Sequence, residues 1–160
     1  PHVALSVGGV GQGRSDEPTL VRMHRAHMLG DVFGEIDSSP DGPTGDTLRA
    51  SMRAVQRAGR GVVIYLRHEG VGDSTAARLM RVRRPDHDPG ADSPQLDHPH
   101  ARDGTDAGAA PATERYIGIG SQILRDLGIS KIRLLTNHAT GVPGLEAFGR
   151  EIVERVRIGP

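Results

Sequence analysis

The 160-residue chain contains no cysteine, which excludes disulfide bonds, thiolate nucleophiles and every cysteine-based metal site. Aromatic residues make up only 2% of the chain, too few for the stacking platforms that bind single-stranded nucleic acid. Lysine plus arginine total 20 and aspartate plus glutamate also total 20, so bulk charge attracts neither nucleic acid nor anionic membranes. No apolar run approaches the ~20 residues of a membrane-spanning helix. We therefore expect a soluble, cytoplasmic protein with no nucleic-acid or membrane partner.

The domain organisation follows from length and local composition. A chain of 160 residues suits one domain with a substantial core, here predicted over residues 1–160. Residues 84–112 are rich in proline, aspartate, glycine and histidine, and Leu96 is their only large aliphatic residue. Such a segment cannot bury enough apolar surface to order itself, which predicts a flexible or disordered insert. Pro1 opens a strand-like region, so we expect the chain to be part of a longer protein.

Apolar periodicity predicts an α+β (mixed α/β) domain, because short strand-like runs alternate with helical spacing. The predicted strands are residues 3–7, 19–23, 62–66, 131–135 and 151–156, and the unbroken run at 62–66 indicates burial on both faces. The predicted helices are residues 47–58, 74–82, 116–127 and 143–148, with Asp46 as the N-cap of the first. Residues 24–47 have the glycine and proline content of a loop.

Polar residues gather where buried strands end, which is where α/β domains place their chemistry. His24 and His27 follow the second strand, and Asp31 lies a few residues further on. The run 67–70, Arg-His-Glu-Gly, follows the third strand, and Thr136 follows the fourth. We expect these loops to carry the functional side chains.

These segments, in this order, resemble the GTP cyclohydrolase II family, whose enzyme opens the purine ring of GTP at the start of riboflavin synthesis. Residues 22–34 look like the family's R-V-H-S-E-C-x-T-G-D-V-F-G, and residues 58–71 like E-G-R-G-x-x-L-Y-x-R-x-E-G-R. Residues 113–128 look like D-x-R-D-Y-G-I-G-x-Q-I-L-x-D-L-G, and residues 133–149 like R-L-L-T-N-N-P-x-K-V-x-G-L-E-x-x-G. The resemblance covers most of the chain outside residues 84–112. It implies a single domain with a mixed sheet flanked by helices, and a homodimer.

The resemblance also implies a zinc ion held by three cysteines, which activates the water that attacks the purine. This chain cannot supply that site, because the first family cysteine falls on His27 and the other two fall between Ser38 and Thr44, where no cysteine occurs. His24, His27 and Asp31 are weak candidates for a replacement site, and polar loop residues are the preferred interpretation. We predict no cofactor, although Mg²⁺ would accompany a phosphorylated substrate.

The family's phosphate-displacing pair is half present. By resemblance Arg115 occupies the nucleophile position, whereas Thr113 replaces the family's aspartate and cannot act as a base at neutral pH. Glu114 could substitute if the backbone turns it inward, and Glu69 matches a glutamate of the substrate cleft. We therefore predict Arg115, Glu114 and Glu69 as catalytic residues.

The family's substrate-binding positions are partly kept. The matching residues are Arg22, His24, Arg67, Gly70, Tyr116 and Thr136. Two family cations are lost, since Val71 follows Glu-Gly and Gly141 replaces a lysine. Each lost charge-assisted hydrogen bond to a triphosphate is worth about 1.5–3 kcal/mol, so we do not expect tight GTP binding in the family's manner.

Three interpretations of function follow. The favoured one is a diverged, zinc-independent enzyme that cleaves a C–N or phosphoester bond in a nucleotide- or ribosyl-type small molecule. The alternative is a non-catalytic paralogue that binds a ligand and regulates. An ordinary GTP cyclohydrolase II is the least favoured, because the zinc ligands, the aspartate and the lysine are missing.

Overall fold

The computed structural model describes residues 1–36, 38–39, 42–67, 112–137, 145 and 149–159, with only the backbone at 112–114. These residues belong to one compact unit. The strands are β1 (Val3–Val7), β2 (Thr19–Arg25), β3 (Gly61–Leu66), β4 (Lys131–Leu135) and β5 (Glu151–Val156). The helices are α1 (Met28–Phe33), α2 (Thr44–Ala58) and α4 (Ala112–Asp126). No helix among the described residues is long and apolar enough to cross a membrane.

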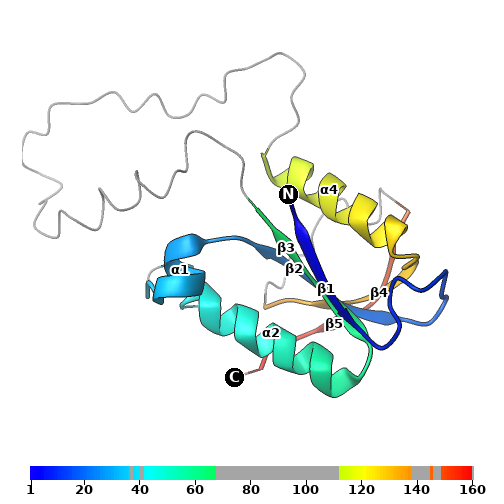
Figure 1. Cartoon of the computed structure of the whole chain (residues 1–160), viewed down its shortest axis with the longest axis horizontal. Coiled ribbons are helices and arrows are strands. Elements are labelled where there is room, and N and C mark those ends of the chain that lie inside the picture. The colour runs from blue at the N-terminus through cyan, green and yellow to red at the C-terminus, as the bar shows by residue number, and fades with distance from the viewer. Residues whose placement is uncertain (37, 40–41, 68–111, 138–144, 146–148, 160) are drawn as a thin grey trace, which may run out of the picture. The chain divides into compact units, whose positions relative to one another are not determined.

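The five strands form one mixed sheet in the order β1-β3-β2-β4-β5 (Figure 1). Strand β1 runs antiparallel to β3, whereas β2, β3, β4 and β5 are parallel to their neighbours. The four parallel strands therefore end at the same edge of the sheet. We call it the carboxyl edge, and the opposite one the amino edge.

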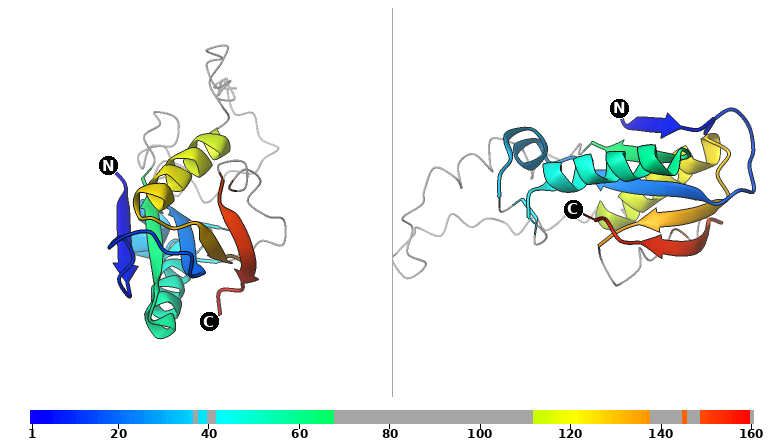
Figure 2. Two further views of the ribbon diagram at one scale, coloured as in Figure 1. Left: turned by 90° about the vertical axis from the view of Figure 1, so that its right-hand side faces the viewer. Right: turned by 90° about the horizontal axis from the view of Figure 1, so that it is seen from below.

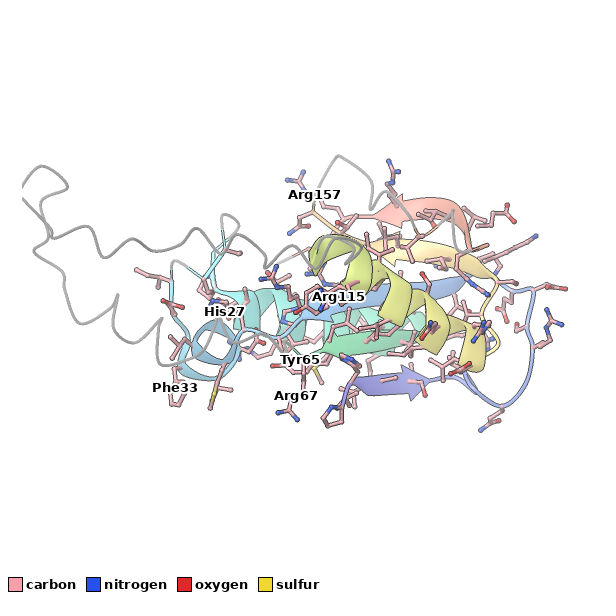
Figure 3. The ribbon with its side chains drawn as sticks, turned by 90° about the horizontal axis from the view of Figure 1, so that it is seen from above. His27, Phe33, Tyr65, Arg67, Arg115 and Arg157 are labelled. Carbon is pink, nitrogen blue, oxygen red and sulfur yellow. The ribbon has the colours of Figure 1, made fainter. Side chains whose placement is uncertain are left out.

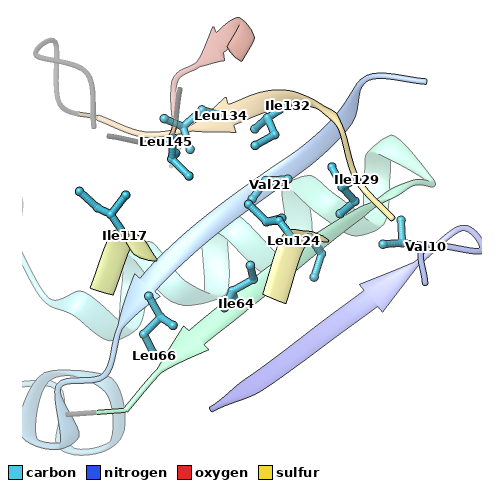
Figure 4. Close-up of a cluster of buried hydrophobic side chains, with 11 residues drawn as sticks. Val10, Val21, Ile64, Leu66, Ile117, Leu124, Ile129, Ile132, Leu134 and Leu145 are labelled. Carbon is cyan, nitrogen blue, oxygen red and sulfur yellow. The ribbon is translucent and has the colours of Figure 1, made fainter. Parts of the chain in front are cut away.

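Helix α4 covers one face of the sheet because its apolar stripe meets alternate residues of the central strands. Leu124 and Ile117 of α4 are buried in the cluster that Figure 4 shows, together with Val21 of β2 and Ile64 of β3. Gly120 lets the helix approach β2, since a Cβ there would overlap the end of the Met23 side chain.

Helix α2 covers the other face, so the sheet lies between two helices (Figure 2). Val55 of α2 packs with Leu20 of β2 and Val63 of β3, the strand residues that alternate with those facing α4. The fully apolar strand β3 is buried on both sides, as its composition predicted. The expected mixed sheet with flanking helices is confirmed.

Several local predictions were wrong. The stretch predicted as a loop from residue 24 contains the end of β2 and all of α1, a six-residue helix too short to show periodicity. Helix α2 begins at Thr44, earlier than predicted, and its N-cap is Pro43 rather than Asp46. Asp46 instead lies in the first turn, where it accepts a hydrogen bond from Arg49 at 2.8 Å.

Other predictions held or lie beyond the described residues. The five predicted strands are all present, and the helix predicted from residue 116 begins earlier, at Ala112. The predicted helix at 74–82 and the predicted flexible insert, apart from residue 112, lie outside the described residues. The predicted helix at 143–148 does too, except for Leu145, which is buried in the core.

Candidate functional site

A buried carboxylate, Asp31 of α1, is the centre of a polar cluster at the carboxyl edge. Its Oδ1 lies 2.9 Å from Nε2 of His24. Its Oδ2 accepts one hydrogen bond from the backbone N–H of His27 and another from the hydroxyl of Tyr65, both at 2.8 Å. Strand register explains the meeting, since His24 and Tyr65 are neighbours across β2 and β3. We call Asp31, His24 and Tyr65 the aspartate cluster.

The electrostatics of the aspartate cluster favour an ionised carboxylate and a neutral phenol. Burial acts to raise the pKa of Asp31, but hydrogen bonds from His24, from the His27 backbone and from Tyr65 outweigh it and hold that pKa well below its usual value. Burial, together with the hydrogen bond to Asp31 and its negative charge, raises the pKa of Tyr65 to about 12. The phenol therefore keeps its proton and donates a hydrogen bond to the carboxylate.

His24 is held in one orientation by two contacts. Its ring stacks on Tyr65 with 5.6 Å between centroids and an interplanar angle of 13°. Its side chain is buried, and Nδ1 has no hydrogen-bond partner within the described part of the chain. Because an ionised carboxylate can only accept, Nε2 of His24 is the donor of the hydrogen bond to Asp31. His24 thus positions Asp31. It is a buried residue and not the polar loop residue that the sequence favoured.

His27 is used as the N-cap of α1. Its Nδ1 accepts a hydrogen bond from the backbone N–H of Gly30 at 3.0 Å, and its Nε2 lies 3.7 Å from a carboxylate oxygen of Glu35. Gly34 ends the helix in a left-handed conformation at φ 72°. The ring is therefore part of the turn that presents Asp31 to the sheet.

These residues do not fit the zinc site that the family resemblance implies. The chain has no cysteine, and the Ser38 hydroxyl accepts a hydrogen bond from the backbone N–H of Thr44 at 2.9 Å. The weak candidates His24, His27 and Asp31 direct their atoms at one another and at the α1 backbone. Among the described residues, no group of three histidine, aspartate or glutamate side chains is arranged to hold a metal ion. The donor chemistry here is that of a hydrogen-bonded cluster.

A second polar group lies on the α4 side of the same edge. The guanidinium carbon of Arg25 lies 5.5 Å from the centroid of the Tyr116 ring, a cation–π contact that joins the end of β2 to the start of α4. Arg115, in the first turns of α4, is exposed and makes no hydrogen bond or ion pair with the described residues. Figure 3 shows Arg115 at the start of α4 and Tyr65 near the end of β3.

Strand alternation divides the predicted binding residues between the two faces. His24 and Arg22 point to the α2 side, whereas Met23 and Arg25 point to the α4 side. Arg22 donates from Nη1 to the carbonyl oxygen of Leu135 at 3.3 Å, which ties β2 to the end of β4. The structure thus brings Arg22 and His24 to one face and the Arg115 turn to the other.

The remaining predicted residues vary in how far the structure describes them. Arg67 follows β3 and is exposed, and Figure 3 shows it beyond Tyr65. Thr136 follows β4 and donates its backbone N–H to the carbonyl oxygen of Val156 at 2.9 Å. Glu69 and Gly70 lie outside the described residues, as do Val71 and Gly141. Glu114 is described only by its backbone, within α4.

Comparison with known proteins identifies the family. The family model of GTP cyclohydrolase II matches residues 1–157. The chain belongs to the GTP cyclohydrolase II family. The expectation drawn from the four sequence segments is thereby confirmed.

Three curated relatives show how the family domain is used elsewhere. A riboflavin biosynthesis protein RibBA of Bacillus cytotoxicus is 38% identical over 97% of this chain and 35% of its own length. A RibBA protein of Parabacteroides distasonis is 34% identical over 98% of this chain and 35% of its own. A probable bifunctional riboflavin biosynthesis protein, RIBA 2, of Oryza sativa subsp. japonica is 37% identical over 97% of this chain and 25% of its own length. The chain thus spans about a third of the length of the two bacterial relatives and a quarter of the plant one.

Two site features of this family member were missed by sequence reasoning. Tyr65 was not among the predicted site residues, yet its hydroxyl donates a hydrogen bond to Asp31. Arg25 was not selected, although its guanidinium covers Tyr116. The only signal for either was its position at the end of a buried strand, where Tyr65 pairs in register with His24.

Proposed function

We propose that the chain is a zinc-independent enzyme of the GTP cyclohydrolase II family that cleaves a C–N or phosphoester bond in a nucleotide- or ribosyl-type small molecule. One observation carries the proposal: a family member without cysteine has, at the carboxyl edge of its sheet, a hydrogen-bonded aspartate cluster and an arginine, Arg115, without a partner among the described residues. A working cytoplasmic homodimer is part of the proposal, by resemblance to the family.

Arg115 is the residue on which catalysis depends in this proposal. It lies in the first turns of α4, where the unpaired backbone N–H groups and the helix dipole attract anions. A guanidinium beside such groups can take a phosphoryl group through charge-assisted hydrogen bonds. Glu114 and Glu69 would serve as acid or base. The substrate would be bound by Arg22, His24, Arg67, Gly70, Tyr116 and Thr136. His24 would act through its hydrogen bond to Asp31.

A non-catalytic, ligand-binding paralogue is the second candidate, and the loss of the family's base favours it. Thr113 stands where the family has its aspartate and cannot take up a proton at neutral pH. A regulatory protein would need only the binding half of the site. The two candidates differ in whether Arg115 supports turnover.

The deciding experiment incubates the purified, metal-analysed protein with GTP and a panel of nucleotides and ribosyl compounds, with products read by mass spectrometry. Turnover of a panel member other than GTP, lost at least about a hundredfold in Arg115→Ala and kept in Arg53→Ala, would support the proposal. Arg53 is a matched control because it is an exposed arginine on α2. A ring-opened GTP product lacking formate would restore the family's own reaction. No turnover together with tight binding would favour the paralogue.

Metal dependence gives a second, separate test. If the donor chemistry excludes the family's zinc site, dialysis against a chelator will leave turnover and the midpoint of thermal unfolding unchanged when Mg²⁺ is restored. A loss that zinc alone reverses would contradict zinc-independent chemistry.

A further inference from the structure

A second polar pocket lies at the amino edge, away from the aspartate cluster. It encloses about 660 Å³ and is lined by Arg14, Ser15, Asp16, Arg125, Gly128, Ser130 and Arg150. These residues come from the segment before β2, the end of α4 and the residues flanking β4 and β5. A volume between about 300 and 1,000 Å³ is typical of small-molecule sites. None of the residues predicted for catalysis or substrate binding lies in it.

The walls of this amino-edge pocket are fixed by backbone contacts. The N–H of Ser15 donates to the carbonyl oxygen of Gly128 at 3.2 Å, and Ser15 forms an isolated parallel bridge with Ile129. Gly128 adopts φ 71°, and a Cβ there would lie 2.5 Å from the carbonyl oxygen of Gly13. Only glycine allows this close approach, so the pocket is built by the fold.

The lining carries an excess of positive charge. Three arginines and one carboxylate, that of Asp16, line the pocket, which gives the lining a formal charge of +2. Asp16 is engaged in part, since one of its oxygens lies 3.4 Å from the hydroxyl of Ser130. The ion pair of Arg125 with Asp126 is long, at 3.8 Å, and exposed, so it holds that guanidinium weakly.

The arginines keep more hydrogen-bond donors than the protein uses. Arg150 is half-buried and donates from Nη1 to the carbonyl oxygen of Ile129, which holds its guanidinium in place. Arg14 makes no hydrogen bond or ion pair with the described residues. A guanidinium held by one bond and a second without a partner among the described residues match the oxygens of a phosphoryl group. The hydroxyl of Ser15 accepts from the backbone N–H of Glu17 and still has its own proton to donate.

We propose that the amino-edge pocket binds a phosphate-bearing small molecule, at a site separate from the proposed active site. The arginines would contact the phosphoryl oxygens, and the serine hydroxyls would contact the remaining polar groups. The proposal does not depend on whether the carboxyl edge is catalytic.

Backbone amide NMR can test the proposal on the whole chain. Titration with inorganic phosphate and, separately, with ribose 5-phosphate is expected to shift the amides of Gly13, Gly128 and Ser130. Tighter binding of the ester would indicate that the larger molecule is the ligand, and equal affinity would indicate recognition of the phosphoryl group alone. Either result supports the site.

The variants decide whether the arginines are responsible. Arg14→Gln and Arg150→Gln are each expected to weaken binding at least about tenfold, and Arg53→Gln to leave it unchanged. Arg14→Gln is the safer variant, because Arg150 also supports the fold through Ile129. Arg53 lines a second arginine-rich groove, on α2. Equal shifts beside Arg53 and in the pocket, or shifts that survive Arg14→Gln, would overturn the proposal.

Discussion

The two edges of the sheet differ in whether their charged side chains find hydrogen-bond partners within the protein. At the carboxyl edge Asp31 receives its hydrogen bonds from within the protein, from His24, Tyr65 and the α1 backbone. At the amino edge Arg14 is exposed and has no partner in the described part of the chain. A buried charge must be compensated by the fold, whereas a charge at the rim of a pocket can await a ligand.

The comparison separates stability from binding. The aspartate cluster joins α1 to β2 and β3, so its loss should be measured mainly in the free energy of unfolding. Apart from the bond of Arg150 to Ile129, the amino-edge arginines make few contacts that stabilise the fold. Their loss should therefore be measured mainly in the affinity for the phosphate-bearing ligand.

The largest expected effect is that of Asp31→Ala. Removing the carboxylate leaves His24, Tyr65 and the His27 backbone without their shared acceptor in a buried site, which should cost about 3 kcal/mol of the free energy of unfolding. Urea denaturation monitored by circular dichroism measures the change. The control is Asp46→Ala, because Asp46 is exposed and its pair with Arg49 should be worth under about 1 kcal/mol. Equal losses in the two variants would contradict the role given to the cluster.

Acid should weaken the same cluster in the wild-type chain. The pKa of Asp31 in the folded state lies below its ordinary value, so its contribution to stability is fully present above the ordinary value and is lost progressively as the pH falls from there toward the folded-state pKa. Denaturation series between about pH 6 and pH 3 should therefore show a steeper fall for wild type than for Asp31→Asn. If wild type and Asp31→Asn lose stability in parallel as the pH falls, the ionised carboxylate is not the source of the acid-sensitive stability.

The aspartate cluster also shows what sequence reasoning could reach. Central strands, flanking helices and the family were predictable because apolar runs and the four motif segments are local signals. Helix α1 was not, since its six residues have no period and their conformation depends on Asp31 meeting β2 and β3. The division of Arg22 and Arg25 between the two faces could be read only once the register was known.

Tyr65→Phe should have a smaller effect, about 1 kcal/mol, since one hydrogen bond to Asp31 is removed and the ring remains. The loss should nearly vanish in an Asp31→Ala background, which a double-mutant cycle measures. The pKa of Tyr65 is raised from 10.0 to about 12 in the folded state, so wild type should lose stability as the pH rises through that interval. Tyr65→Phe should lack that alkaline loss, and a cycle with additive effects would show that the hydroxyl acts elsewhere.

The smallest effect on stability is expected at the amino edge. Arg14→Gln removes a guanidinium that is exposed and unpaired among the described residues, so the free energy of unfolding should change by less than about 0.5 kcal/mol. Ribose 5-phosphate should raise the unfolding midpoint of wild type, because a ligand that binds only the folded state stabilises it, and should raise that of Arg14→Gln much less. The two edges would then differ in what their variants change. A carboxyl-edge variant changes the stability of the ligand-free protein, whereas an amino-edge variant changes only how far the ligand stabilises it. A large loss of stability in ligand-free Arg14→Gln would instead make that arginine part of the framework and remove the contrast.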